Sequence, residues 1–204
     1  MTTVETVEKT YGKRVRKVHT WDRDPHDFYI EPEWCSRVLF ANVRFTGTVF
    51  DPACGTGRIV KAAQAAGLIG LAADIVDRGY EPAAVADFLQ LGNPYDNIVS
   101  NPPFKIAREF AEHALKLAVD KVALLLPLGW LNGDARSRWL EQQPLRAVYI
   151  LTPRPSMPPG EMVLAGVRPQ GGKQDFAWYV FDHDYDGKPT IGWLRNPNAK
   201  RRNL

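Results

Sequence analysis

The sequence has little cysteine and no long apolar run, and both absences narrow the class of protein. Its 204 residues include only two cysteines, Cys35 and Cys54, which stand 19 positions apart and outside any CxxC pattern. Such sparse cysteine predicts a reduced, cytoplasmic protein. No apolar run approaches the roughly 18 residues of a transmembrane helix, and residues 1–17 contain no apolar signal-peptide core. We therefore expect no membrane partner.

Metal-ligand and phosphate-loop patterns are also missing. The four histidines show no ligand spacing, so we expect no metal site. The glycine-containing stretch VFDPACGTGRIV has no Walker lysine, which excludes a P-loop. Val60 stands where the dinucleotide-binding pattern GxGxxG would have its third glycine, which argues against that class as well.

The composition is that of a globular domain whose basic excess lies at its ends. Apolar residues make up 45% and charged residues 24%, and the net charge is +3. Residues 1–26 carry six basic and four acidic side chains, and residues 195–204 carry four basic and none acidic. We expect a flexible basic arm (1–25), a single domain (26–194) and a basic tail (195–204). Such ends either solubilise the protein or contact phosphates.

Short apolar runs alternate with helical stretches from residue 48 onward, which predicts an α/β fold. The expected sheet has seven mostly parallel strands with helices on both faces. The expected strands are Thr48–Asp51, Gly70–Asp74, Ala84–Phe88, Asp96–Ser100, Lys121–Leu126, Ala147–Leu151 and Phe176–Phe181. The expected helices are Arg58–Ala66, Lys105–Val119 and Asp134–Gln142. The stretch 152–174 contains five prolines and predicts a long loop without regular structure.

Acidic residues follow successive predicted strands, beside a glycine turn. Gly55 and Gly57 permit a tight turn, and the helix that follows offers free amide groups. Asp51 at the end of the first strand suits a cationic ligand that carries a free amine. Asp74 ends the next strand, where a carboxylate can accept both ribose hydroxyls of a nucleoside. Asp87 is placed to contact an adenine amino group, so the three carboxylates predict a nucleoside pocket.

The tetrapeptide Asn101-Pro102-Pro103-Phe104 follows the fourth predicted strand directly. Its prolines remove backbone donors and stiffen the turn, so the carbonyl of Pro102 is free to accept. The Asn101 side chain offers a second acceptor, and two acceptors can bind both hydrogens of a planar amino group. Phe104 offers a flat face for an aromatic base.

Together, DPACGTG and NPPF resemble the S-adenosylmethionine (SAM)-dependent amino-methyltransferases with a (D/N)PP(Y/F) motif. The sequence is most similar to small phage-type DNA adenine-N6 methyltransferases, over roughly residues 26–182. HDFYIEPEWCSRVLF resembles the N-terminal cofactor motif of that family, carried here by Asp27, Tyr29 and Pro32. The resemblance implies a Rossmann-like class I methyltransferase fold, located in a bacterial or phage-infected host cytoplasm. The implied SAM-binding residues are Tyr29, Pro32, Asp51, Pro52, Ala53, Gly55, Gly57, Asp74, Ile75, Asp87 and Phe88.

The implied reaction transfers a methyl group to the exocyclic N6 amine of adenine, with nucleic acid, most simply DNA, as partner. Catalysis would rest on positioning by residues 101–104. Trp130 stands either in the wall of the base pocket or in the core, and Arg154 and Ser156 in the proline-rich stretch are candidate substrate contacts. The same chemistry on RNA (adenine-N6 or guanine-N2), DNA cytosine-N4 or protein glutamine-N5 remains an alternative, as does a non-catalytic remnant that binds cofactor or nucleic acid. No separate target-recognition domain is predicted, and the oligomeric state stays open.

Overall fold

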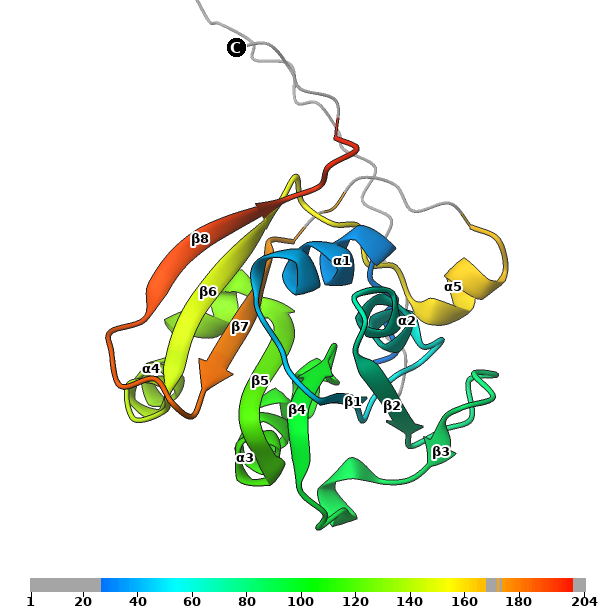
Figure 1. Cartoon of the computed structure of the whole chain (residues 1–204). Helices are drawn as coiled ribbons and strands as arrows, with labels where there is room; N and C mark the ends of the chain where they lie inside the picture. Colours follow the sequence, from blue (N-terminus) through cyan, green and yellow to red (C-terminus); the bar gives the residue numbers. More distant parts are fainter. Residues whose placement is uncertain (1–26, 168–171, 173, 200–204) are drawn as a thin grey trace, which may run out of the picture.

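Strands of four to ten residues dominate the chain, and they assemble into one eight-stranded sheet with a two-residue strand at one edge. The computed structural model describes residues 27–167, 172 and 174–199 (Figure 1). The spatial order of the strands is β3-β2-β1-β4-β5-β7-β6-β8. Their bounds are β1 Thr48–Asp51, β2 Ile69–Asp74, β3 Ala84–Val85, β4 Tyr95–Ser100, β5 Ala118–Pro127, β6 Leu145–Thr152, β7 Phe176–Asp182 and β8 Thr190–Arg195.

All the strands run parallel except β7, which lies between β5 and β6 and is antiparallel to both. The carboxyl ends of β1, β2, β4 and β8 therefore lie at the same edge of the sheet. Because loops at that edge of an open α/β sheet form the usual ligand site, the strand order places the predicted motifs together.

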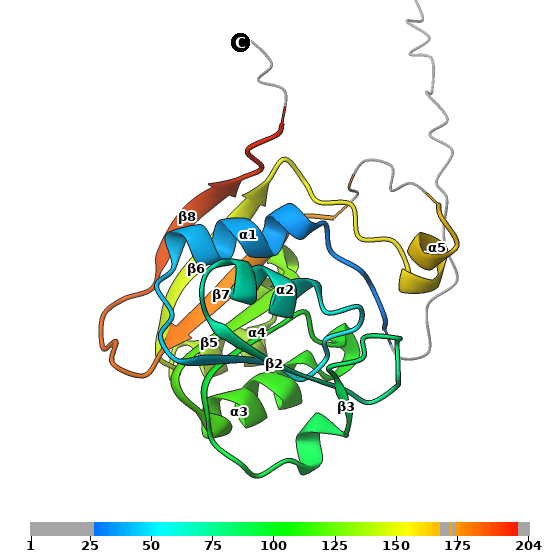
Figure 2. The same cartoon turned by 45° about the vertical axis from the view of Figure 1, so that its right-hand side comes forward.

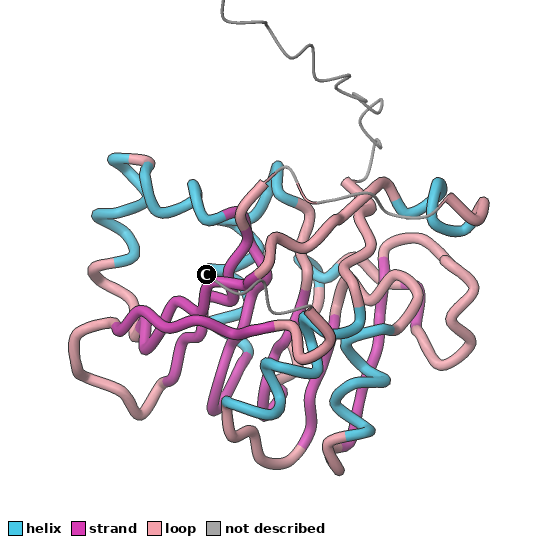
Figure 3. The backbone as a smooth tube through the Cα atoms, turned by 90° about the horizontal axis from the view of Figure 1, so that it is seen from above, coloured by secondary structure: helices cyan, strands magenta, loops and turns pink. Residues whose placement is uncertain are grey.

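Helices cover both faces of the sheet, as Figures 2 and 3 show. Two of them, α1 and α2, pack on one face, and α3 and α4 pack on the other. The helices are α1 Glu33–Asn42, α2 Arg58–Ala65, α3 Ala107–Leu117, α4 Asp134–Leu140 and α5 Gly160–Leu164, with 3-10 turns η1 Phe88–Gln90, η2 Phe104–Ile106 and η3 Leu128–Asn132. The predicted α/β architecture is thus confirmed.

Several predicted boundaries were wrong. The sheet has an eighth strand, β8, which begins inside the predicted domain and ends at Arg195, the first residue of the predicted tail. The predicted loop 152–174 contains the short helix α5. The third strand is only Ala84–Val85, because Asp87 accepts a hydrogen bond from the backbone N–H of Leu89 and starts the turn η1. The residues from 1 to 26, and from 200 to 204, lie outside the described part of the chain.

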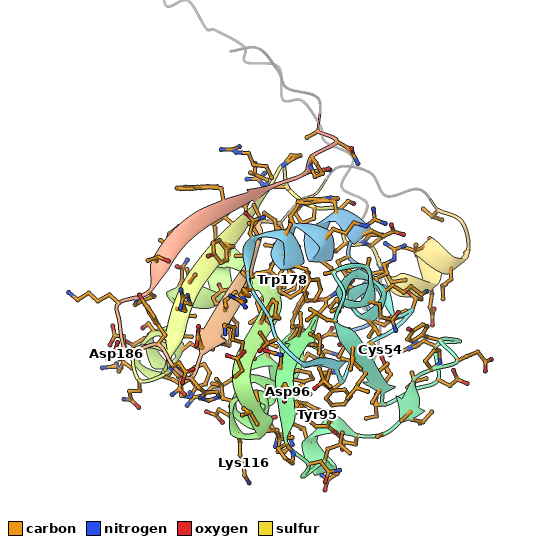
Figure 4. All side chains as sticks on the ribbon, viewed as in Figure 1. Cys54, Tyr95, Asp96, Lys116, Trp178 and Asp186 are labelled. Carbon is orange, nitrogen blue, oxygen red and sulfur yellow. The ribbon has the colours of Figure 1, made fainter. Side chains whose placement is uncertain are left out.

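The core forms two apolar layers, one on each face of the sheet. Trp178, Tyr179 and Phe181 on β7 belong to the core, and all three are fully buried. Figure 4 shows Trp178 beneath α1, where its indole N–H donates to the backbone oxygen of Cys35 at 2.9 Å. This contact fixes α1, and so the segment that precedes it, against the sheet. None of the helices in the described ranges is long and apolar enough to cross a membrane.

Candidate active site

A pocket lies at the carboxyl edge of β1, β2 and β4, where the sequence motifs converge. Five segments contribute to it: residues 27–31, the glycine turn, the loop after β2, the loop after β3, and the Asn-Pro-Pro turn after β4. The predicted site residues that line it are Tyr29, Asp51, Pro52, Ala53, Gly55, Asp74, Ile75, Asp87, Phe88, Asn101 and Pro103. Most of the predicted cofactor residues therefore share one cavity.

The glycine turn links β1 to α2, and Gly57 precedes the first residue of that helix with φ +74°. A Cβ at position 57 would lie 2.6 Å from the ring of Tyr80, so only glycine fits there. The Gly55 N–H donates to Asp74 Oδ2 at 2.8 Å, and the Val76 N–H donates to Asp74 Oδ1 at 3.1 Å. Asp74 therefore orders the turn itself, a role beyond the ribose contact predicted for it.

Asp51 is a buried carboxyl group whose hydrogen-bond partners among the described residues all contact Oδ1. The Ser100 hydroxyl donates to its Oδ1 at 2.8 Å, and the Ala53 N–H donates to the same atom at 3.2 Å. Burial raises the pKa of Asp51 well above its ordinary value, and the neighbouring charges of Glu31 and Asp74 raise it further. A bound cation would stabilise the ionised form of such a group.

Asn101 lines the pocket, and its side chain has one acceptor without a partner among the described residues. Its Nδ2 group donates to the backbone oxygen of Tyr29 at 2.8 Å and to Glu31 Oε2 at 3.0 Å. Its Oδ1 is buried and has no hydrogen-bond partner among the described residues. Since buried polar atoms are nearly always paired, this oxygen is the group in the pocket best placed to accept from a ligand.

Glu31 is a site residue that the sequence reasoning missed, although it stands within the N-terminal motif between Tyr29 and Pro32. It is 6% exposed, and the Arg58 guanidinium donates to its backbone oxygen at 2.6 Å. Burial raises the pKa of Glu31 from 4.5 to about 7, although the hydrogen bond from Asn101 and the charge of Arg58 oppose that shift. Only the fold, which brings residues 31 and 101 together, shows its position.

The pocket is lined by more acidic than basic side chains. Five carboxylates line it, against two guanidinium groups; the carboxylates are Asp27, Glu31, Asp51, Asp74 and Asp87, and the guanidinium groups are Arg58 and Arg78. None of the five carboxylates forms an ion pair with another described residue. The sequence analysis assigned no site role to either arginine. The two side chains reach the pocket from different elements. The excess of acidic side chains favours a cationic ligand. The two guanidinium groups can also bind a carboxylate on that ligand.

Asp27 adds a second free acceptor. Its backbone has φ +52°, which is uncommon for a residue other than glycine, and its Oδ2 accepts from the Lys105 N–H at 3.0 Å. The other oxygen, Oδ1, is buried and has no partner among the described residues. The carboxylate therefore ties the N-terminal segment to the turn after Phe104.

Aromatic rings and a second strap of main chain surround the mouth of the pocket. The rings of Tyr29 and Phe104 are parallel, at 6° with centroids 6.0 Å apart. The Arg78 guanidinium lies 4.2 Å from the centre of the Phe28 ring. Residues 28–30 also pair with residues 158–160, since the Gly160 N–H donates to the Phe28 oxygen at 2.8 Å. Two segments distant in sequence thus cover the site together.

Other predicted residues lie outside the pocket lining. Pro32 precedes α1, Pro102 is buried behind Asn101, and Gly57 lies beneath the ring of Tyr80. Phe104 lies next to the site, where its ring stacks on that of Tyr29. The centroid of its ring also lies 5.8 Å from the centroid of the Phe176 ring.

The three predicted substrate contacts also lie elsewhere. Trp130 is a core residue, 7% exposed, packed edge-on against Trp139 and Tyr179. Arg154 is exposed and paired with Asp175 at 2.5 Å, and Ser156 lines a separate surface hollow that reaches Arg58. The core alternative for Trp130 is therefore the correct one, because its ring fills the space between α4 and the sheet. The absence of a metal site stays a prediction.

The strand order and the antiparallel β7 define the class: the protein has the class I Rossmann-like methyltransferase fold. Solved structures of this fold resemble it at low sequence identity. A candidate RNA methyltransferase from Pyrococcus horikoshii, PH1948, matches with a TM-score of 0.56 and 14% identity, over 72% of this chain and 81% of that one. At this level of identity, the likeness shows a common fold.

Two further structures are similar. A protein studied for the conversion of a disulfide bond into a thioacetal group during echinomycin biosynthesis matches with a TM-score of 0.55 and 14% identity, over 81% of this chain and 88% of that one. The magnesium protoporphyrin IX methyltransferase of Synechocystis PCC 6803 with bound SAM has a TM-score of 0.49 and 15% identity, over 73% and 75% of the two chains. Comparison with protein-family models finds no match, and comparison with curated proteins finds none either.

Proposed function

We propose that the protein is a SAM-dependent N-methyltransferase that methylates the exocyclic N6 amine of adenine in DNA. The observation that carries this proposal is the unpartnered Oδ1 of Asn101, which is buried at the pocket beneath the Asn-Pro-Pro turn. An acceptor held there matches the need of a reaction in which a planar amino group must be oriented. The resemblance of DPACGTG and NPPF to DNA adenine-N6 methyltransferases supports the choice of substrate.

The residues present fit SAM as a cofactor. The carboxylates of Asp51 and Asp74 would hold its ammonium group and ribose hydroxyls, and Asp87 with Phe88 would hold its adenine. Arg58 and Arg78 offer guanidinium groups for its carboxylate, a contact that the sequence did not predict. When bound, SAM supplies an electrophilic methyl group on a sulfonium ion, and the excess of carboxylates in the pocket suits that positive charge.

The chain itself contributes position and hydrogen bonding. Asn101 Oδ1 accepts one hydrogen of the target amine, and the backbone oxygen of Pro102 is the predicted acceptor for the other. Acceptors on both hydrogens direct the nitrogen lone pair out of the plane of the ring, toward the methyl donor. Phe104 would stack on the base, which must leave the helix if the DNA is double-stranded. Catalysis by positioning of this kind needs no covalent protein intermediate.

The test is to incubate the protein with methyl-labelled SAM and, in separate reactions, DNA, RNA or protein, and then to identify the methylated nucleoside or amino acid by mass spectrometry. We expect N6-methyladenine in DNA. Label in RNA or protein alone would overturn the proposed substrate. Cofactor binding without product on any substrate would overturn the proposed activity and favour a non-catalytic remnant.

The matched variant is Asn101→Ala. It removes the free acceptor, so turnover should fall roughly 100- to 1,000-fold, by analogy with the loss of one positioned hydrogen-bonding group in other active sites. Calorimetry should still show SAM binding, because the acidic residues of the cofactor side remain. Normal turnover by this variant would refute the role assigned to Asn101.

A further inference from the structure

We propose that Glu31 is a positioning residue, whose carboxylate holds the Asn101 amide so that Oδ1 faces the pocket. The inference rests on the proposed function, since it assigns a role to Oδ1 in binding the target amine. It concerns a residue that makes no proposed contact with substrate. The feature that singles it out is a buried carboxylate bonded to the amide of the central residue of the site.

The geometry gives the Asn101 amide one favourable orientation. Its Nδ2 group carries two hydrogens, and two acceptors face it, the Tyr29 backbone oxygen at 2.8 Å and Glu31 Oε2 at 3.0 Å. If the amide were inverted, Oδ1 would face those same two acceptors, and neither could donate to it. The NH2 group would then point at the target amine, which also offers hydrogens. An ionised Glu31 therefore disfavours the inverted, unproductive orientation.

Protonation of Glu31 removes this discrimination. A carboxylic acid can donate its hydrogen to Oδ1, so the inverted amide becomes acceptable at this contact. Three groups on the neighbouring elements act on the charge of Glu31. Arg58 on α2 favours its ionised form, Asp51 on β1 opposes it through like charge, and Cys35 on α1 is a buried neutral thiol. Turnover should thus fall as the pH drops through the titration of Glu31, near pH 7 in the free protein.

Two substitutions of similar volume separate positioning from other roles. In E31Q the side chain has both an acceptor and a donor, like the protonated acid, so kcat should no longer depend on pH in this range and should stay near the low-pH value of wild type. In E31M the Tyr29 oxygen is the one described acceptor left at Nδ2, so the amide is held less firmly and kcat should fall below that of E31Q, by roughly 100-fold relative to wild type. Thermal unfolding checks that both variants are folded.

Each contrary result has a definite meaning. A wild-type kcat that keeps falling below pH 7 without a plateau, to values under that of E31Q, would identify a proton-accepting role and would overturn the positioning role. Unchanged kcat in E31M would also overturn it.

A second measurement requires no substrate. In protein labelled with 15N-asparagine, the Asn101 side-chain amide signals are assigned by their loss in N101D. They should titrate with pH in wild type and stay fixed in E31Q. Fixed signals in wild type would overturn the proposal. Titrating signals in a protein that methylates nothing would instead contradict the proposed function alone.

Discussion

At the scale of single residues, the pocket contains polar atoms whose hydrogen bonds within the described chain are incomplete. The Oδ1 atoms of Asn101 and Asp27 are both buried without a partner, although unpaired buried polar atoms are rare in folded proteins. Glu31 and Asp51 are buried carboxyl groups with raised pKa values. These groups cost stability in the free protein, which is typical of residues kept for binding or catalysis rather than for folding.

The raised pKa of Glu31 predicts a pH-dependent stability difference. Between pH 4.5 and about 7 the folded protein binds more protons than the unfolded chain, so wild-type stability falls as the pH rises through this range. Above pH 7 the ionised group costs roughly 3 kcal/mol, from a shift of about 2.5 units. E31Q lacks this cost, so its advantage in the free energy of unfolding should grow to about that size by pH 8.

Urea unfolding of wild type and E31Q at pH 5 and pH 8 measures this difference. The advantage of E31Q should shrink to roughly 1 kcal/mol at pH 5, because Glu31 is largely protonated in the folded protein but mostly ionised in the unfolded chain. A constant difference between the two proteins at both pH values would contradict the assigned titration. Saturating SAM should reduce the advantage at pH 8, because a cationic ligand stabilises the ionised carboxylate.

Phe104 is predicted to bind the base by stacking. In F104A the KM for nucleic acid should rise roughly 10- to 100-fold, the range expected from alanine substitution of a stacking residue. F104Y keeps the aromatic face and is the matched control, with a KM close to wild type. Steady-state kinetics with the methylated substrate checks this prediction. An unchanged KM in F104A would remove Phe104 from the substrate site.

At the scale of elements, the glycine turn depends on backbone space that another side chain limits. In G57A the alanine must adopt a left-handed backbone conformation, and its methyl group is also forced against the ring of Tyr80. In G67A the residue has the same kind of φ, +83°, but no atom lies within 4 Å of the added methyl group. The left-handed conformation costs roughly 1–2 kcal/mol at either position. G57A should therefore lose more stability than G67A, and it alone should lose SAM affinity.

Denaturant unfolding and calorimetric titration with SAM test this pair of variants. The clash in G57A moves the start of α2, whose first residue, Arg58, lines the pocket. Gly67 follows the other end of the same helix, away from the site. Equal losses in the two variants would show that only backbone strain matters and that Tyr80 moves freely.

The sequence predicted which residues meet in the pocket where those residues stand at the ends of strands. Asp51, Asp74 and Asn101 were identified because each stands at or directly after a strand, and parallel strands bring those positions to one edge. Glu31 and Arg58 carry no such signal, since they reach the pocket only through the packing of α1 against α2. For Trp130 the sequence left two alternatives, because an aromatic residue beside a site motif can equally fill the core.

The fold was predicted in class but not in every element. The apolar runs of the strands predicted an α/β sheet, yet β8 was missed because Ile191 and Trp193 are exposed and the strand has no apolar inward run except Leu194. It is an edge strand held by parallel pairing with β6. Helix α5 was missed because the prolines of 152–174 predicted a loop. Pro158 and Pro159 precede this helix and do not interrupt it.

At the scale of the whole molecule, basic residues are expected to contact the nucleic acid backbone. Residues 196–198 line a hollow that also includes Arg58, a pocket residue, so the basic stretch 200–202 continues from a point beside the site. Replacing Lys200, Arg201 and Arg202 by glutamine should weaken DNA binding. It should also make the slope of log affinity against log salt shallower by up to about 3.

Binding measured by fluorescence anisotropy at several salt concentrations tests this prediction, with SAM affinity as the control that should not change. If the slope is the same in wild type and in the triple variant, the tail makes no phosphate contact. The alternative, that the basic end serves solubility, would then be preferred.

The direction of β8 has a practical consequence for attaching the protein to a surface. Because β7 is antiparallel to its neighbours, it ends at the edge of the sheet opposite the pocket. Strand β8 then returns the chain to the edge where the pocket lies. Residue 27 lines the pocket and residues 196–198 line a hollow that also includes Arg58, so an anchor placed at either of these positions would lie close to the pocket. Lys116, exposed at the far end of α3 in Figure 4, is the better anchor. A cysteine placed there would react selectively, because Cys35 and Cys54 are buried, and would leave the pocket open to a large substrate.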